Sequence, residues 1–256
     1  MLSLWPPQFP EMGFPDESEY QGGTTSGELV HGIFAFSNHE VYDGEWRDNK
    51  LEGRGTVSDD HRLRREENPR DEFRGTHYAG EWKQNRFDGE GSYTWASGSS
   101  YTGQWKEGKK HGRGKYVLTN TNSYEGEWVE DEMHGEGVYA TRVIGKDAIT
   151  SLYEGQWEHD HRAGAATTTY ADGDVEVQRW EPGPLHDAPG GPAPTRSDRR
   201  VGPGVRWCAD GTKAWRLLDG IAGDEIELEE AATIAAEIGR PVPDFPRPVL
   251  STSKFG

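Results

Sequence analysis

Residues 101–117 read YTGQWKEGKKHGRGKYV, and this stretch decides the fold. A β-strand sends alternate side chains to opposite faces, so Tyr101, Gly103 and Trp105 share one face of a predicted strand. The next segment, residues 106–110, combines charged side chains with a glycine, as turns do. The chain can then return as a second strand. The stretch therefore predicts a β-hairpin, and a helical period does not fit it.

The returning strand carries Gly112 and Gly114, which alternation places on a single face. A glycine inside a strand costs about 0.5–1 kcal/mol relative to alanine. Two glycines at a fixed phase therefore imply a steric requirement. Aromatic rings lying flat over both glycines would supply it.

The same pattern recurs along the chain. Copies of Y-x-G-x-W start at Tyr42, Tyr78, Tyr101, Tyr124 and Tyr153. Gly-x-Gly follows each copy at one offset, although the last copy has Ala166 at the second position. The spacing is 23 residues from Tyr78 to Tyr101 and again from Tyr101 to Tyr124. The other steps, of 36 and 29 residues, fit the same period with insertions, so the sequence predicts an array of hairpins.

The composition argues against several classes of protein. The chain has 256 residues and a formal net charge of −17, which disfavours nucleic acid as a partner. A hydrophobic content of 32% and a mean hydropathy of −0.93 are typical of disordered chains. Ten Trp, ten Tyr and eight Phe residues oppose disorder. We therefore expect the stability to come from aromatic rings rather than from an aliphatic core.

A cytoplasmic location is predicted from features that the sequence lacks. Cys208 is the only cysteine, so no intrachain disulfide can form, which fits a reducing compartment. The N-terminal stretch has prolines and acids where a secretory or transit peptide needs a basic and then an apolar segment. No segment approaches the roughly 18 apolar residues of a membrane span.

The repeated residues resemble the MORN repeat (membrane occupation and recognition nexus), whose pattern is close to Y-x-G-x-W-x-x-G-x-x-x-G-x-G. The resemblance covers residues 20–181, and the copy at Tyr101 nearly matches the consensus. It implies an all-β fold, an elongated, twisted antiparallel sheet of repeated β-hairpins. Similar proteins include radial-spoke head proteins of cilia, apicomplexan scaffolds and junctophilins. Others carry a lipid kinase or a histone methyltransferase, with catalysis in an additional domain.

The resemblance also implies an aromatic-lined groove along one face of the sheet. The rings of the five copies are the predicted partner-binding residues. They are Tyr42, Trp46, Tyr78, Trp82, Tyr101, Trp105, Tyr124, Trp128, Tyr153 and Trp157.

Four segments follow from these observations. Residues 1–19 are an N-terminal extension, residues 20–181 the repeat array, residues 182–203 a Pro/Gly-rich flexible linker, and residues 204–256 a small C-terminal segment. The array has five clear units, starting at 42, 78, 101, 124 and 153, with a degenerate copy as a cap at each end. In the last of these copies, Gln178 replaces the glycine.

The C-terminal segment is too short for a kinase or methyltransferase domain. Its sequence predicts a β-hairpin that turns at Asp210 and Gly211, and a short helix over residues 229–238 that ends at Gly239. The apolar stripe of this helix is Leu228, Ala232, Ala235 and Ile238. Two interpretations stay open: the stripe covers an edge of the last hairpin near Trp180, or it lies in a groove of a partner.

No residue pattern favours catalysis, a cofactor or a metal. The Gly-x-Gly pairs lack the strand-loop-helix context of a phosphate loop. Recurring Glu45, Glu81 and Glu127 are interpreted as the solvated face of the sheet, because a catalytic site needs one constellation rather than one residue per copy. The histidines at 159 and 161, and those at 111 and 134, lack the three or four convergent ligands of a metal site.

The insertion at residues 61–74 is charged and mixed in sign. It is an exposed loop or a docking site for a partner, and the sequence leaves both open.

The sequence therefore favours a non-catalytic scaffold or structural subunit that binds proteins along an extended groove, in an assembly of cytoskeletal or axonemal kind. A homodimer through exposed edge strands stays open. The alternative is a peripheral membrane module that binds phospholipids. An anionic leaflet repels a chain of net charge −17, which disfavours membrane contact.

Overall fold

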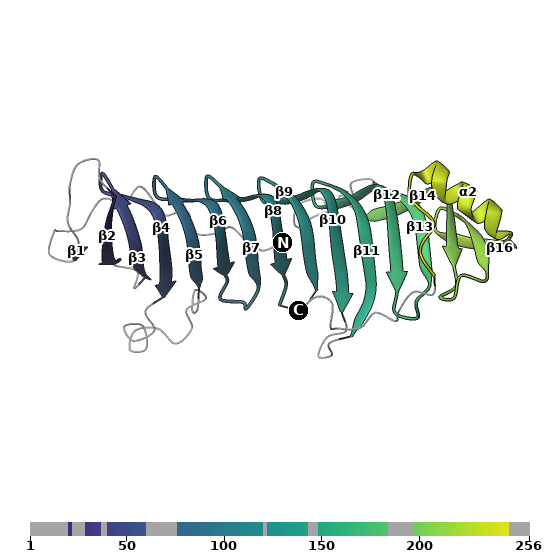
Figure 1. Ribbon diagram of the computed structural model, residues 1–256, viewed down its shortest axis with the longest axis horizontal. Coiled ribbons are helices and arrows are strands. Elements are labelled where there is room, and N and C mark those ends of the chain that lie inside the picture. The colour runs from purple at the N-terminus through teal and green to yellow at the C-terminus, as the bar shows by residue number, and fades with distance from the viewer. Residues whose placement is uncertain are drawn as a thin grey trace, which may run out of the picture. The chain divides into compact units, whose positions relative to one another are not determined.

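The computed structural model describes residues 20–21, 29–36, 40–59, 76–119, 122–142, 148–183 and 197–245. Within these ranges almost all residues lie in antiparallel strands, with one helix that follows the last strand (Figure 1). The all-β prediction is confirmed. The extension at 1–19 and the insertion at 61–74 lie outside the described residues, so the interpretations given for them stay predictions.

The described elements are named as in Figure 1. The strands are β1 (Tyr20–Gln21), β2 (Val30–Ala35), β3 (Glu40–Arg47), β4 (Lys50–Asp59), β5 (His77–Lys83), β6 (Arg86–Thr94), β7 (Ser100–Lys106), β8 (Lys109–Val117), β9 (Ser123–Val129), β10 (Glu132–Arg142), β11 (Ile149–Glu158), β12 (His161–Tyr170), β13 (Val175–Pro182), β14 (Asp198–Trp207), β15 (Ala214–Leu218) and β16 (Ile221–Ile226). The helix is α2 (Leu228–Ile238).

The chain forms two compact units. The N-terminal unit contains the described residues up to Thr119 together with Trp128–Asp131, and the C-terminal unit contains residues 122–127 and those from Glu132 onward. In the N-terminal unit, β1 to β8 lie side by side in sequence order, each antiparallel to the next. In the C-terminal unit, β10 to β16 do the same. Both units are therefore stacks of hairpins.

The hairpin of β7 and β8 confirms the predicted alternation. Tyr101, Gly103 and Trp105 are buried, and the residues between them are exposed. The turn is tighter than predicted, because only Glu107 and Gly108 separate the strands, with φ of 51° and 82°. Two consecutive residues with positive φ are typical of a type I′ turn, whose twist matches that of the strands.

The two glycines of each Gly-x-Gly have different functions. A Cβ on Gly114 would overlap the Tyr101 ring, as predicted, whereas a Cβ on Gly112 would overlap the side chain of Gln104. The prediction that rings cover both glycines is therefore wrong for Gly112. The reason is a β-bulge between Gly103 and Trp105, which gives Gly112 a φ of 59° and turns it away from the ring.

This bulge also corrects the interpretation of the recurring Glu and Gln residues as merely solvated. The Arg113 backbone N–H donates to Gln104 Oε1 at 3.0 Å, and the Arg54 N–H donates to Glu45 Oε2 at 2.6 Å. These N–H groups lie at the bulge, where regular pairing is interrupted. The side chains therefore satisfy donors that the ladder leaves open.

The linker predicted at 182–203 is wrong at its C-terminal end. Strand β14 starts at Asp198, and its Arg200 and Arg206 pair with Trp180 and Glu176 of β13. The same register joins β11 to β12, where Trp157 pairs with Arg162 and Tyr153 with Thr168. Strands β13 and β14 are therefore a sixth hairpin of the repeat type. Residues 184–196, between them, lie outside the described residues.

Helix α2 and the hairpin of β14 and β15, which turns at Asp210 and Gly211, confirm the predicted elements of the C-terminal segment, with one correction. The buried stripe is Ala231, Ile234, Ala235 and Ile238, whereas Leu228 is 45% exposed. This stripe packs on Val177, Val205 and Trp207 of β13 and β14. The helix therefore covers a face of the sheet, and β14 covers the edge near Trp180.

Candidate functional site: the aromatic face and its polar end

Every copy of the repeat uses its Tyr in the same hydrogen bond. The hydroxyl donates to the backbone carbonyl three residues on, at 2.8–2.9 Å, in the pairs Tyr42 with Glu45, Tyr78 with Glu81, Tyr101 with Gln104, Tyr124 with Glu127, and Tyr153 with Gln156. The ring thereby crosses its own strand and lies over the glycine between the two partners. Burial raises the pKa of all five Tyr hydroxyls, which keeps them neutral donors.

The Trp residues join successive hairpins. The indole N–H donates to a glycine carbonyl on the preceding strand, at 3.0–3.2 Å, in the pairs Trp46 with Gly32, Trp82 with Gly55, Trp105 with Gly91, and Trp128 with Gly114. Gly32 thus accepts from Trp46 as a repeat glycine does from the later Trp residues. Each bond satisfies a buried polar group, and the indoles of Trp82, Trp105 and Trp128 pack edge to face on the Tyr of the preceding copy.

The ten predicted groove residues are all buried, with 0–5% of their surface exposed. Within a copy, the Tyr and Trp rings meet edge to face, with centroids 5.1 Å apart for Tyr42 and Trp46 and 5.0 Å apart for Tyr101 and Trp105. They are therefore core residues in this structure rather than the exposed lining of a groove. Partner contact along this face stays a proposal.

The residue paired with each Trp changes along the chain. It is Leu51 opposite Trp46, Phe87 opposite Trp82, Lys110 opposite Trp105, Arg162 opposite Trp157 and Arg200 opposite Trp180. The later side chains are cations over rings. The Lys110 ammonium lies 4.3 Å from the Trp128 ring centroid, and Arg162 and Arg200 lie 4.9 and 5.1 Å from that of Trp180. No sequence pattern predicted these cation–π contacts, because the partners are distant in the chain.

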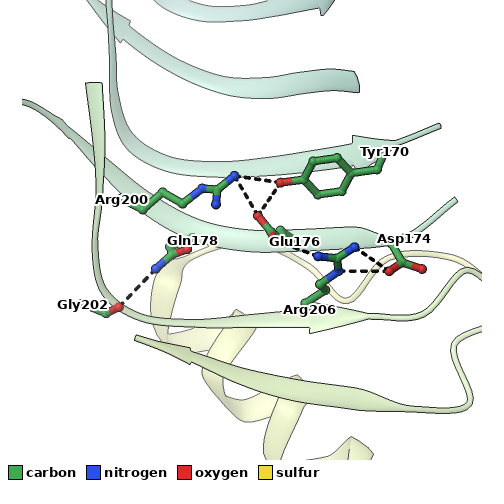
Figure 2. Close-up of polar contacts among 7 residues, drawn as sticks. All are labelled: Tyr170, Asp174, Glu176, Gln178, Arg200, Gly202 and Arg206. Carbon is green, nitrogen blue, oxygen red and sulfur yellow. Dashed lines mark hydrogen bonds and ion pairs between the residues drawn. The ribbon is translucent and has the colours of Figure 1, made fainter. Parts of the chain in front are cut away.

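In the sixth hairpin, Glu176 occupies the Tyr position and Gln178 the glycine position. Glu176 is 4% exposed, and Figure 2 shows it among Tyr170, Arg200 and Arg206. The Tyr170 hydroxyl donates to its carboxylate at 2.7 Å, and the Arg200 guanidinium lies 3.2 Å from it. This cluster of charged groups replaces the ring cluster of a regular copy.

The remaining contacts complete this polar cluster. Arg206 donates twice to one carboxylate oxygen of Asp174, at 3.0 and 2.8 Å, and lies 3.8 Å from Glu176. Gln178 donates to the Gly202 carbonyl at 3.3 Å (Figure 2). Two guanidinium groups thus face two carboxylates, so the cluster is neutral as a whole. Burial, followed by the hydrogen bond to Glu176, raises the pKa of Tyr170 to about 12.

Comparison with known families agrees with this geometry. The MORN repeat model matches residues 42–58, 78–100, 101–123, 124–141, 153–175 and 196–213. The chain belongs to the MORN-repeat proteins. A search among curated proteins gives no match.

The last matched segment contains β14, which pairs with β13, the strand of the predicted degenerate C-terminal copy, and this pairing was not predicted from the sequence. One sequence signal could have found it, since Gly202 and Gly204 form a Gly-x-Gly. They were missed because the first of them lies 22 residues after Trp180, against 7 between Trp105 and Gly112. In β13, Glu176 and Gln178 replace the Tyr and the Gly of the MORN pattern, which leaves Trp180 as its recognisable residue.

The opposite face of the MORN sheet is polar. In the N-terminal unit it has an open hollow with a floor formed by the backbone of Gly44, Gly55 and Gly80. Its rim includes His31, Asp43, Glu45, Arg54, Glu81 and Glu90.

The histidines considered as metal ligands form ordinary pairs. His159 contacts Glu132 at 2.6 Å, and its ring lies against that of His134. His161 contacts Asp198 at 2.9 Å. Across the described ranges, no three His, Cys, Asp or Glu residues gather as metal ligands would. The described part of the chain also has no helix with the length and apolarity that a membrane crossing requires.

Proposed function

We propose that this MORN-repeat chain is a non-catalytic scaffold that holds other proteins along its hairpins, in a larger assembly of cytoskeletal or axonemal kind. The observation that supports this most is the repetition of one hydrogen-bonded Tyr-Gly-Trp unit in five copies. Such a unit produces a periodic surface, which suits extended protein contacts better than a single reaction centre. The ten buried rings set the spacing, and the side chains between them make the contacts.

The polar hollow of the N-terminal unit is the first place to test. Asp43 and Glu90 lie on its rim and are exposed, so charge reversal there changes the surface and leaves the rings in place. Tagged wild-type protein and the D43K/E90K variant are expressed in the source cell, and captured proteins are quantified by mass spectrometry. The control is E107K/E125K, which makes the same change of charge at exposed positions away from the hollow.

We expect D43K/E90K to lose partners that the wild type and the control retain, with equal melting temperatures. An identical set of captured proteins in all three samples would overturn binding at the hollow. Sedimentation with vesicles containing phosphatidic acid tests the membrane alternative, and we expect none at physiological salt. Salt-resistant sedimentation would replace the scaffold with a membrane module.

A further inference from the structure

Among the residues that the structure describes, no strand pairs with the outer edge of β16. In the C-terminal unit β16 is the last strand of the sheet, and β15 is the strand to which it pairs among the described residues (Figure 1). Its residues from Ile221 to Glu225 are all exposed. Helix α2 packs on β13, β14 and β15, and in β16 only Ile226 lies against the core that the helix covers. A row of backbone N–H and C=O groups therefore faces away from β15, available for pairing with another strand.

The edge of β16 carries acidic rather than basic side chains. Natural edges are blunted by charged side chains, above all lysine, by proline, by β-bulges or by a covering segment. The pairing of β15 with β16 has one register shift, between Trp215 and Leu217. β16 reads IAGDEI, with neither lysine nor proline. Instead, two large apolar side chains lie opposite each other at its start, Leu218 at 62% exposure and Ile221 at 75%. Exposed apolar residues beside an unpaired edge are typical of a surface that a partner covers.

The negative charge around β16 favours a partner with basic side chains. Asp224, Glu225, Glu227, Glu229 and Glu230 follow one another without a base. Two of them form exposed ion pairs, Glu225 with Lys213 and Glu230 with Arg216, which leaves a net charge of −3. Antiparallel pairing of β16 with a second copy would bring two such segments side by side, and like charges repel. A strand with basic side chains is attracted instead.

We propose that the open edge of β16 binds an extended segment of a partner protein by strand addition. Backbone hydrogen bonds hold the added strand, basic side chains lie beside Asp224 and Glu227, and an apolar side chain packs on Leu218 and Ile221. In antiparallel pairing, the basic residues of the partner precede its apolar residue. This inference rests on the proposed scaffold function because both require a protein partner. It places that partner at β16 rather than at the polar hollow of the N-terminal unit.

The probe is a short fluorescent peptide of alternating lysine and valine, titrated into the full chain and followed by anisotropy. The test variant is I221K/D224K, which changes one exposed apolar and one exposed acidic residue of β16. Its matched control is V129K/E125K on β9, where both residues are also exposed. Melting temperatures check that all three proteins fold. A second peptide carries N-methyl groups at alternate residues, so it keeps its charge but cannot donate backbone hydrogen bonds along one edge.

We expect I221K/D224K to weaken binding at least tenfold and V129K/E125K to change it less than threefold. The N-methylated peptide binds at least tenfold more weakly than the plain one, and amide hydrogen exchange in residues 221–226 slows only with the plain peptide. Equal binding by the wild type and I221K/D224K, or by both peptides, overturns the proposal. If that occurs while D43K/E90K still loses cellular partners, the scaffold function stands without the β16 site.

Discussion

The hairpin of β7 and β8 and the hairpin of β13 and β14 share a register but are filled differently. In the first, Tyr101 lies over Gly114 and the opposite face is polar. In the second, Glu176 and two guanidinium groups replace the ring cluster, and the opposite face is apolar and covered by α2. The glycine bulge and the Trp pairing therefore define the hairpin, while the Tyr position accepts either a ring or an ion cluster.

The difference also shows how each region obtains its core. A regular copy buries its aromatic face, and the Trp of the next copy packs on its Tyr ring. The sixth hairpin has Val177, Val205 and Trp207 on the face that is polar elsewhere, so it needs an outer layer. Helix α2 provides that layer, and Arg179 donates to the carbonyl of Ile238 at its C-terminal end. The last hairpin is therefore covered because apolar residues replace polar ones on its outer face. Loss of the repeat pattern alone would not let a helix pack there.

Substitution of a core Trp has the largest expected effect. Trp105→Ala removes a ring that is 3% exposed and its hydrogen bond to Gly91, so we expect a loss of about 3–5 kcal/mol in the free energy of unfolding. Trp180→Ala is the comparison, because Trp180 is only half-buried between two guanidinium groups. Urea unfolding measures both. A larger loss of unfolding free energy for Trp180→Ala than for Trp105→Ala would contradict the view that the regular copies depend more on their rings than the sixth hairpin does.

The outer layer of the cap is tested at Ile238. Ile238→Ala leaves a cavity between α2 and the sheet, which costs about 2–4 kcal/mol. Leu228→Ala on the exposed side of the helix changes stability by less than about 0.5 kcal/mol. Equal losses measured by urea unfolding would show that the helix does not pack as described.

The ion cluster is tested by Glu176→Gln. This change leaves Arg200 and Arg206 without their shared counter-charge, and both are about one-third exposed, so solvent reduces the cost to about 1–3 kcal/mol. Glu181→Gln breaks an exposed pair with Arg199 and costs less than about 1 kcal/mol. A Glu176→Gln protein as stable as the wild type would show that the cluster contributes little to the cap.

The bulge glycine is tested by Gly112→Ala. Positive φ disfavours any side chain there, and the Cβ also displaces Gln104, so the expected loss is about 2 kcal/mol. Gly98→Ala has the same backbone penalty with open space around the Cβ, and the expected loss is about 1 kcal/mol. The difference between the two melting curves isolates the contact with Gln104. Identical curves would remove that contact from the explanation of the repeat.

The smallest effect is expected at alkaline pH. Tyr170 ionises near pH 12 in the folded protein and near its ordinary value of about 10 when unfolded. Since the folded pKa is the higher one, this stabilisation is complete below about pH 10 and is lost as the pH rises towards 12. Melting temperatures across this range should fall less steeply for Tyr170→Phe than for the wild type. Parallel curves would show that Tyr170 is not held by the cluster.

Much of the fold was predictable because it depends on local rules. Period-two alternation, turn residues and the 23-residue spacing fixed the hairpins from Tyr42 to Tyr153. The ten candidate residues were also found from sequence, but their burial was not, because the neighbours that cover each ring come from other hairpins. The exposed edge of β16 likewise depends on where the helix packs rather than on its own six residues.

The sequence by itself determined the repeat, its strand alternation, the turn at Asp210 and Gly211, and the helix that ends at Gly239. These features follow from side-chain alternation and from backbone angles that glycine adopts readily. Only the tertiary structure decided that β14 pairs with β13 and that Glu176 is buried. Pairing across a 15-residue insertion and burial of a charge both depend on partners that the chain brings together only when it folds.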